Sequence, residues 1–536
     1  MKHKVFIVII MLSSCRLFAA TQPDQLQQEL QRLQQQTAQL QAQISQLQKQ
    51  MVVAKQKPHP AKAPSKPSAS IKTETNPINT GLSTPAKLLP TQPIHNTPVT
   101  VHTLDATPES LEFYPTALVA NEHVMTYIAG TPVVSSPYLG ARPAFDGSDY
   151  IVNISSINRD IRLMQQRRRL YRAYESIGYP HPNVPIIALS GKVEPIATVN
   201  QPVVGATTGD ITLGSGELDI AAVLNDKVEA YIGIAYDESP PAVGGQRIAN
   251  SAFNLNMGFV NIGDLDESPF YFTGGQLFVP YGRFSTAMVS APLTMLMART
   301  KSRPFILGYK SQKDTGMFAA LYGFSSDTTM GSSAAGGLNL GYIYGRGDVT
   351  GEVGASFLSS LNDSGGMQRN GSQPGTTFGG FSSPSNGSEN VKKIPGVGAH
   401  WNMSFDRYNL TAEWVASMHA FRTQDLSFND HGASPQAGQL EAGMTFMSFH
   451  RPSSLGIDYQ WTRDALALNL PQQRISAVYN ISIWKDTIES LEYRHDINYK
   501  LGQYANGAAP AGIVNANTLG TGGSSDTVLA QIGVFF

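Results

Sequence analysis

The sequence predicts an all-β transmembrane barrel of about 16 antiparallel strands, preceded by an N-terminal α-helical coiled coil. After Pro180, apolar and polar residues alternate in segments of about ten residues, separated by turn residues. The chain also ends in an amphipathic strand with a terminal phenylalanine, Phe536. No internal apolar run reaches the length of about 20 residues that a spanning helix requires. A closed barrel is then the remaining structure that pairs its backbone groups within a bilayer.

Composition excludes several classes of partner and site. The formal net charge of -1 argues against a nucleic-acid partner, because such proteins usually carry a strongly basic face. The single cysteine, Cys15, lies in the export-signal region and leaves the mature chain without a disulfide framework or a cysteine-rich metal site. The sequence shows no phosphate-binding glycine-rich loop and no metal-ligand cluster, so we expect no cofactor.

Residues 1–20 are typical of a secretory signal peptide. Two lysines precede an apolar run from Val5 to Leu12, and Ala19 and Ala20 close the segment. The stretch that ends at Cys15 also resembles a lipobox, so lipidation of this cysteine stays open. Cleavage after Ala20 is favoured, because Arg16 would lie next to a lipidated cysteine. Both interpretations export the chain.

Residues 21–53 predict a periplasmic coiled coil. Apolar residues recur at alternating steps of four and three, with glutamine at most positions between them. The stripe consists of Leu26, Leu30, Leu33, Leu40, Ile44, Leu47 and Met51, with Thr37 as its one polar member. On a solitary helix this narrow apolar stripe would be exposed to water. We therefore expect a homo-oligomer, either a dimer or a trimer. A glutamine-rich disordered tail is the alternative.

Residues 54–110 are rich in Pro, Lys, Ser and Thr and predict an extended, semi-rigid linker. One interpretation is that it holds the coiled coil away from the membrane, near anionic peptidoglycan; a plain solvated spacer is the simpler interpretation. Residues 111–183 then form a predicted periplasmic segment, and within it residues 154–179 indicate a basic amphipathic helix. This helix could lie on anionic lipid, reach into the barrel mouth and line the solute path, or cap the periplasmic rim.

Residues 184–536 are predicted to form the outer-membrane barrel. In residues 455–462, for example, Leu455, Ile457 and Tyr459 alternate with Gly456, Asp458 and Gln460. The sixteen expected strands are 184–200, 209–224, 227–238, 252–263, 269–279, 303–312, 315–325, 337–346, 349–359, 396–405, 407–421, 438–449, 453–463, 473–484, 487–497 and 525–536. An even number brings both barrel ends to the periplasmic side. Long polar insertions such as 360–390 alternate with short connections and are expected outside the cell.

Aromatic residues gather near the ends of these segments, where interfacial girdles would need them. They are Tyr236, Phe405, Tyr408, Phe421, Phe449, Trp461 and Trp484. The last strand, with its terminal Phe536, is similar to the strand of outer-membrane proteins that the barrel-assembly machinery recognises. We therefore expect outer-membrane lipid and this machinery as partners.

Three segments resemble the LbtU family of siderophore porins: 126–132 (TYIAGTP), 171–175 (YRAYE) and 189–195 (LSGKVEP). The stretch 274–282 (GGQLFVPYG) looks like a strand and loop of that family and of many other porins. The resemblance covers most of the chain from about residue 110. It implies a sixteen-stranded channel that takes up a ferric siderophore without a large plug domain. The family supplies no motif that assigns a ligand-binding residue.

Charged side chains on the lumen-facing phase of the strands are the candidates for solute selectivity. They are Lys192, Glu194, Glu229, Glu352, Glu413, Asp458, Arg474, Glu492 and Arg494. For each, a solvated lumen position or an interstrand ion pair is the simpler interpretation. The alternatives to siderophore uptake are a general or anion-selective diffusion porin, and an envelope tether acting through the N-terminal arm.

Catalysis is not expected from this sequence. His495 and Asp496 are the best fragments of a catalytic group, but adjacent residues on a strand point to opposite faces. They therefore cannot form a simple acid–base pair.

Overall fold

The fold is seen in a computed structural model of the chain. It describes residues 124–128, 131–135, 160–161, 163–164, 167, 186–237, 254–313, 315–326, 334–346, 349–369, 392–423, 425–484, 486–505 and 519–536. The predicted signal peptide, coiled coil and linker lie outside the described residues, and so do most residues of the predicted basic helix.

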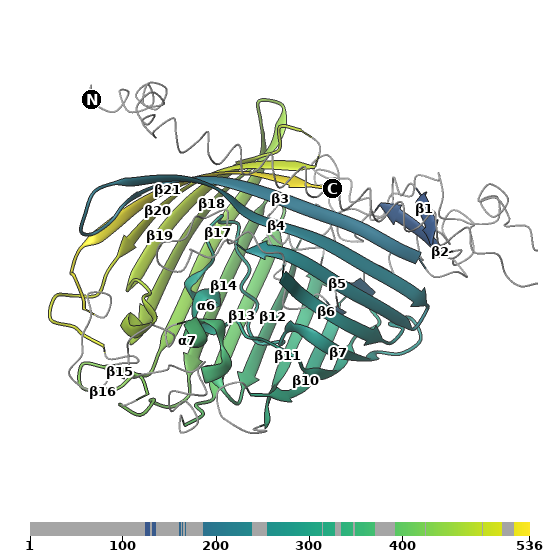
Figure 1. Ribbon diagram of the computed structural model, residues 1–536, viewed down its shortest axis with the longest axis horizontal. Coiled ribbons are helices and arrows are strands. Elements are labelled where there is room, and N and C mark those ends of the chain that lie inside the picture. The colour runs from purple at the N-terminus through teal and green to yellow at the C-terminus, as the bar shows by residue number, and fades with distance from the viewer. Residues whose placement is uncertain are drawn as a thin grey trace, which may run out of the picture. The chain divides into compact units, whose positions relative to one another are not determined.

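Sixteen of the nineteen strands in the main sheet form a closed antiparallel ring, as the sequence predicts (Figure 1). Strand β21 closes the ring by pairing with β3, from Asp526 opposite Gln201 to Phe535 opposite Lys192. The ring strands are β3 (Ile186–Gln201), β4 (Thr208–Asn225), β5 (Val228–Asp237), β6 (Asn254–Ile262), β7 (Phe270–Phe278), β9 (Phe305–Lys310), β10 (Gly316–Ser325), β11 (Ala334–Arg346), β12 (Val349–Leu358), β13 (Gly396–Phe405), β14 (Tyr408–Ser417), β17 (Gln436–Ser448), β18 (Arg451–Arg463), β19 (Gln473–Ile481), β20 (Thr487–Ile497) and β21 (Ser524–Phe535).

Several short elements accompany the ring. A hairpin of β1 (Val124–Ile128) and β2 (Thr131–Ser135) joins the sheet, because β2 pairs in parallel with the first residues of β3. Strand β8 (Lys301–Ser302) pairs with β7, and β15 (Ser427–Phe428) pairs with β16 (His431–Gly432). The helical elements are α6 (Leu293–Ala298), η4 (Leu361–Asp363), α7 (Gly365–Arg369) and η7 (Leu466–Leu468). The β1–β2 hairpin was not predicted from the sequence.

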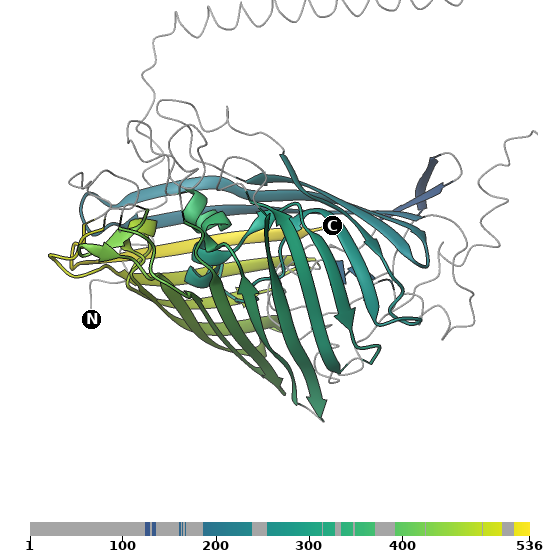
Figure 2. The same cartoon turned by 90° about the horizontal axis from the view of Figure 1, so that it is seen from below.

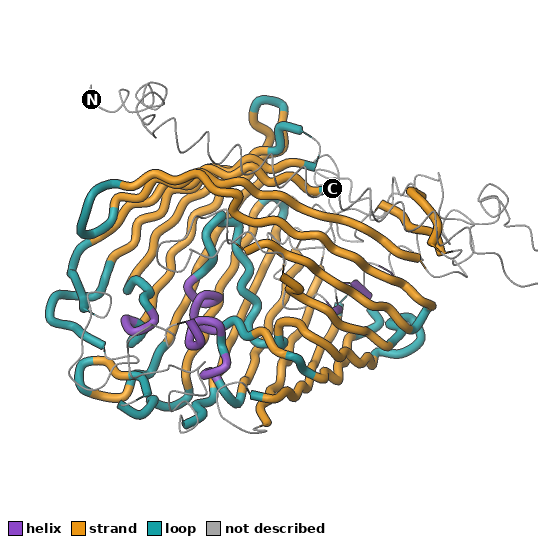
Figure 3. Tube along the Cα trace, in the orientation of Figure 1, coloured by secondary structure: helices purple, strands orange, loops and turns teal. Residues whose placement is uncertain are grey.

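The two ends of the barrel differ in their connections. We call the end that holds Ile186 and Phe536 the near end, and the opposite end the far end. Near-end turns are short: residues 226–227, 406–407 and 449–450 each join two strands. Far-end connections are longer and include 279–304, 359–395 and 498–523, drawn partly as teal loops in Figure 3. This alternation of short and long connections is the one that the sequence predicts.

The outer face of the ring is apolar, because every ring strand exposes at least one large apolar side chain. One from each strand in chain order is Val193, Leu218, Ile232, Val260, Phe272, Leu307, Leu321, Leu340, Val353, Trp401, Leu410, Leu440, Ile457, Ile475, Leu491 and Val528. A continuous apolar belt of this extent would be unstable in water and fits a lipid environment. Among the described residues, no helix combines the length and the apolar character needed to cross a bilayer.

Exposed aromatic residues gather around the near-end turns. Phe405 and Tyr408 stack at 6.3 Å between ring centroids, and Phe449 and Trp484 are exposed at their own turns. Two aromatics toward the far end that the sequence assigned to the interfacial girdles, Tyr236 and Phe421, are instead buried. Tyr236 is buried although β5 pairs with β4 without a register shift from Glu229 to Asp237; the shift between β5 and β6 leaves its extra residue, Asn256, on β6. Phe421 lies beyond the end of β14 and packs into the core of the far-end loops.

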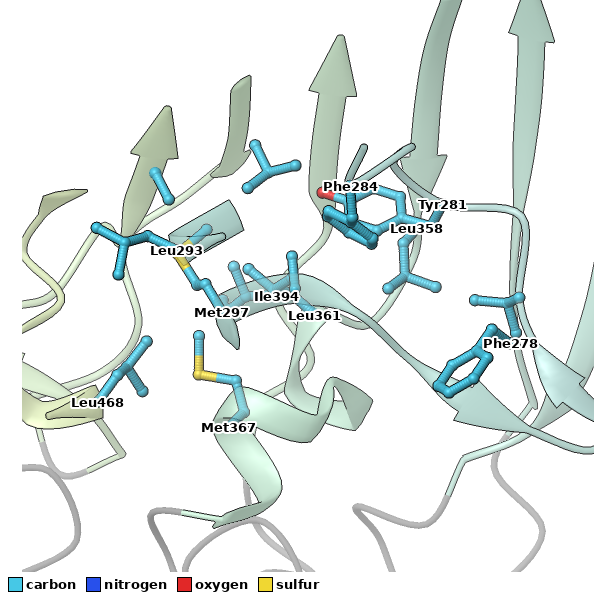
Figure 4. Packing of buried hydrophobic residues seen from close by; sticks show 14 of the residues in the cluster. Phe278, Tyr281, Phe284, Leu293, Met297, Leu358, Leu361, Met367, Ile394 and Leu468 are labelled. Atoms are coloured by element: carbon cyan, nitrogen blue, oxygen red, sulfur yellow. The ribbon is translucent and has the colours of Figure 1, made fainter. Parts of the chain in front are cut away.

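The far-end loops fold into the ring and share one apolar core with its inner wall. Figure 4 shows Leu293 and Met297 of α6 close to Met367 of α7 and Leu361 of η4. Tyr281 and Phe284 belong to the same cluster. Figures 1 and 2 both place α6 and α7 within the ring of strands. The barrel interior is therefore partly filled by its own loops.

Candidate constriction inside the barrel

The connection between β7 and β9, residues 279–304, enters the interior and is called the inner loop below. Its entry turn depends on Gly282, whose φ of 75° lies in the left-handed region that favours glycine. A Cβ there would lie 2.4 Å from Cζ of Phe284, so the buried ring of Phe284 would have to shift. The Gly282 amide donates a hydrogen bond of 3.0 Å to Oγ of Ser356 on β12.

Glu413 on β14 holds the first part of the inner loop. Its Oε1 accepts the amide of Arg283 at 2.5 Å, and its Oε2 accepts the amide of Phe284 at 2.8 Å. The hydroxyl of Thr294 also donates to Oε2 at 3.1 Å. One buried carboxylate thus satisfies two backbone amides that have no secondary-structure partner.

Glu441 on β17 and Glu492 on β20 hold the next part. Glu441 accepts the Ala287 amide at 2.7 Å and the Thr286 hydroxyl at 2.6 Å. Glu492 accepts the amide of Ser290 at 2.8 Å and also its hydroxyl. These bonds have an ionisable acceptor, and charge-assisted hydrogen bonds are stronger than neutral ones.

Two further contacts bind the residues that follow Ser290, at Ala291 and Leu293. Oε1 of Gln460 on β18 accepts the Leu293 amide at 2.6 Å, at the beginning of α6. Arg474 of β19 donates to the carbonyl of Ala291 at 3.1 Å. Along its length the inner loop is therefore bonded first to β12, β14 and β17, then to β20, β19 and β18, and at Thr294 again to β14.

An ion pair adds to the attachment at β12. Arg283 Nη2 lies 3.5 Å from Oε2 of Glu352, and His400 Nε2 lies 2.9 Å from Oε1 of the same carboxylate. Both side chains of the arginine pair are nearly inaccessible to solvent. Glu352 therefore binds one basic group from the inner loop and one imidazole from β13.

The inner loop crosses the ring. It leaves β7, and its contact strand β18 is eight strands away around the sixteen-stranded ring, which is the opposite wall. Glu413 is the sixth of the ten residues of β14, so this attachment lies near mid-height. A segment bound across the ring at mid-height narrows the interior, and its carboxylate and amide partners fix its position.

The nine charged residues singled out from the sequence all have partners in the structure. Glu352, Glu413 and Glu492 bind the inner loop, as described above. Lys192 Nζ lies 2.5 Å from Oε2 of Glu194, and Glu229 pairs with Arg167. Arg474 and Arg494 lie 2.7 and 3.1 Å from Asp496, and Asp458 accepts a hydrogen bond from Gln460. Of these contacts, Arg474–Asp496 is an interstrand ion pair, which is the simpler interpretation. A role of any of the nine residues in selectivity stays a prediction.

Sequence reasoning missed four residues of this site: Arg283, Glu441, Gln460 and Asp496. Glu441 and Gln460 lie on the same polar phase as their predicted neighbours, so the alternation of their strands was a usable signal. Asp496 was considered only as a partner of His495. The structure pairs Asp496 with Arg474 on the inner face and His495 with Asp526, at 2.8 Å, on the outer face. The two residues form no pair, as predicted.

A closed ring with an apolar exterior, a polar interior wall and loops folded inside defines a transmembrane β-barrel protein. The chain belongs to the UPF0422 family. It is 63% identical over 540 residues to a UPF0422 protein of Legionella pneumophila subsp. pneumophila (strain Philadelphia 1), with 100% of both chains covered. It is also 34% identical over 405 residues to a UPF0422 protein of Coxiella burnetii, covering 75% of this chain and 83% of the relative.

The chain is also similar to solved outer-membrane structures. An anion-selective porin from Comamonas acidovorans matches with a TM-score of 0.43 and 13% identity, covering 66% of this chain and 100% of the porin. OprB of Pseudomonas putida matches with a TM-score of 0.40 and 11% identity, covering 65% of this chain and 94% of OprB. No protein-family model matches the chain.

Proposed function

We propose that the protein is an outer-membrane channel for a small solute, narrowed at mid-height by the inner loop. The observation that carries the proposal is the attachment of this loop across the ring, through Glu413, Glu441 and Glu492. A barrel that only served as a membrane anchor would not need a loop bonded to the opposite wall. Non-helical backbone at membrane depth is tolerated where protein buries it or where it lines an aqueous interior.

The proposal includes an orientation in the membrane. The near end faces the periplasm, because outer-membrane barrels have short periplasmic turns and longer extracellular loops. The predicted coiled coil and linker, which precede β3 in the chain, then lie in the periplasm. The far-end connections, including 359–395, face the medium.

The finer part of the proposal is a ferric siderophore as the solute. The resemblance of residues 126–132 and 189–195 to LbtU siderophore porins supports it. A general or anion-selective diffusion porin is the second candidate. The buried wall of the described barrel bears both carboxylates and basic groups, and the pairs Lys192–Glu194 and Arg474–Asp496 neutralise part of this charge locally.

Channel activity is tested by reconstituting the full chain into a planar bilayer. Stepwise conductance that is absent from matched empty-detergent controls supports the channel. A correctly folded barrel that gives no conductance under any applied voltage contradicts it and favours the structural tether.

The solute is tested by uptake of radiolabelled ferric siderophore in an iron-limited deletion strain. The intact gene is restored as the control. Uptake that is lost on deletion and regained with the gene supports the siderophore. Unchanged siderophore uptake together with reduced passage of unrelated small solutes replaces it with a diffusion porin.

A further inference from the structure

A short helical segment from the predicted basic helix lies inside the barrel at its near end. Its described residues are Asp160, Ile161, Leu163, Met164 and Arg167, and all except Ile161 are buried. Their contacts are with β5, β6, β7 and the turn between β6 and β7. Of the three placements that the sequence left open, these contacts agree with insertion into the barrel mouth.

Arg167 makes the central polar contact of this segment. Its Nη2 donates to the carbonyl of Gly263 at 2.7 Å, and its Nη1 lies 3.4 Å from Oε2 of Glu229. The side chains of Arg167 and Glu229 are only 5% and 6% exposed. A buried ion pair of this kind is costly to break from one side, because the remaining charge is left without compensation.

Asp160 is bound at the other end of the segment. The side-chain Nδ2 of Asn261 donates to the Asp160 backbone carbonyl at 3.0 Å and to Oε1 of Glu229 at 2.9 Å. The Thr273 hydroxyl lies 3.3 Å from Oδ2 of Asp160. Asn261 therefore bonds both to the segment and to the carboxylate that pairs with Arg167.

Apolar contacts complete the docking surface. Met164 packs with Leu265 and Tyr271, with Ile161 beside them. Leu163 belongs to the main core cluster, together with Tyr231 and Phe259 of the wall. The segment thus presents apolar side chains to the wall between two polar contacts, which is the arrangement of a specific intramolecular interface.

The docking site lies at a different height from the inner loop. Glu229 is the second residue of β5 and Asn261 is the next-to-last residue of β6, so both are close to the near-end rim. The inner loop is bonded near mid-height to the opposite wall, at Glu413 and Glu441. Two separate parts of the chain therefore occupy the interior in series.

We propose that the described residues of this segment, Asp160, Ile161, Leu163, Met164 and Arg167, form an intramolecular plug of the near-end mouth, held in place by the Arg167–Glu229 pair. Its release opens the mouth without moving the inner loop. Its role as a gate rests on the proposed channel function, whereas its docking does not. The binding partner of the near-end wall is thus a segment of the same chain that precedes the barrel.

Docking is tested by labelling a cysteine at Leu163 in the full chain, with Cys15→Ser as the background. A water-soluble maleimide should label Leu163→Cys slowly, because this side chain is 5% exposed. Glu229→Gln and Arg167→Gln should each raise the labelling rate about tenfold or more, since each leaves one buried charge unpaired. The double variant Arg167→Gln/Glu229→Gln should raise the labelling rate by less than the product of the two single increases, because the two residues are directly coupled.

Lys227→Gln is the matched control. Lys227 lies two residues from Glu229 and pairs with Glu267 at 2.7 Å, but both side chains are mostly exposed. It should leave labelling unchanged. Fast labelling of Leu163→Cys in the otherwise unmodified chain, or rates that Glu229→Gln and Arg167→Gln do not alter, would overturn the plug.

Conductance of the same variants separates the plug from the channel. Higher conductance in Glu229→Gln, together with faster labelling, supports a plug that gates a channel. If Glu229→Gln speeds labelling but the barrel never conducts, the result supports the docked segment and refutes both the channel and the gate. Conductance that is equal in all variants, despite faster labelling, refutes the gate and leaves the channel standing.

Discussion

Removing the Glu413 carboxylate should detach the first part of the inner loop. In Glu413→Ala, the amides of Arg283 and Phe284 lose the acceptor that they share, and so does the Thr294 hydroxyl. Hydrogen bonds to a charged group contribute about 1.5–3 kcal/mol each, so the two amide bonds together are worth about 3–6 kcal/mol. We expect the lower end, about 3 kcal/mol, because Glu441 and Glu492 still hold the rest of the loop.

Hydrogen exchange measures this change directly. A loss of about 3 kcal/mol in local opening free energy should raise the exchange rate of the Arg283 and Phe284 amides about 100-fold. Glu489→Gln is the matched control. Glu489 also accepts a backbone amide, that of Ile483 at 2.9 Å, but it does so at a near-end turn.

The reasoning predicts a local effect in the inner loop. Peptides from β10 to β12 should keep their exchange rates in Glu413→Ala. An inner loop that exchanges in Glu413→Ala within about threefold of the unmodified chain would show that the carboxylate does not hold it.

Three further changes test other parts of the structure. Gly282→Ala should destabilise the inner loop by about 1–2 kcal/mol because of the φ of 75°, and further because the added Cβ meets Phe284. Gly502→Ala is the control, since Gly502 has a φ of 87° but an added Cβ there would meet no atom within 4 Å. Equal effects of the two variants on hydrogen exchange or thermal unfolding would refute the steric contribution of Phe284. Ile457→Lys, in the middle of β18 and 57% exposed, should cost about 2–4 kcal/mol in folding into lipid vesicles. Met447→Lys, close to a near-end turn, should cost only about 0–1 kcal/mol, and similar costs at both sites would argue against a lipid-facing belt. Burial raises the pKa of Asp160, which lies outside the membrane-spanning strands, to about 6, and the groups around it are Thr273, Glu229, Arg167 and Tyr271. The docked state therefore prefers the protonated carboxyl of Asp160. Docking weakens as the pH rises to about 6 and changes little above it, so the undocked fraction should be about tenfold larger at pH 8 than at pH 5. The labelling rate of Leu163→Cys, divided at each pH by that of Asp160→Asn/Leu163→Cys, measures this ratio, and a ratio independent of pH would contradict it.

The strands and their order could be predicted because the information is local. Alternation in 455–462 requires only that Ile457 and Asp458 point to opposite faces, and the structure shows Ile457 exposed and Asp458 fully buried. All sixteen predicted strands pair in the expected antiparallel order. Phe421 was misplaced because it lies beyond the last residue of β14, where the two-residue period of a strand no longer applies.

The candidate site was only partly predictable. The phase of their strands selected Glu352, Glu413 and Glu492 as inward-facing residues. Their partners could not be inferred, because Arg283 and Glu413 lie 130 residues apart and meet only across the closed ring. For the same reason, pattern alone could not choose among three placements of the basic helix, since Arg167 and Glu229 become neighbours only when β5 and β6 form the wall.

The sequence by itself determined the class of fold, the number of strands and, in segments such as 455–462, the side that faces lipid, because these depend on the two-residue period of a strand and on the location of turn residues. Tertiary structure alone decided what occupies the interior. Closing the ring brings the inner loop to the opposite wall and the Asp160–Arg167 segment to the near-end mouth. Buried carboxylates and amides then pair with whichever partners the closed ring places within about 3 Å, since leaving them unpaired would be costly.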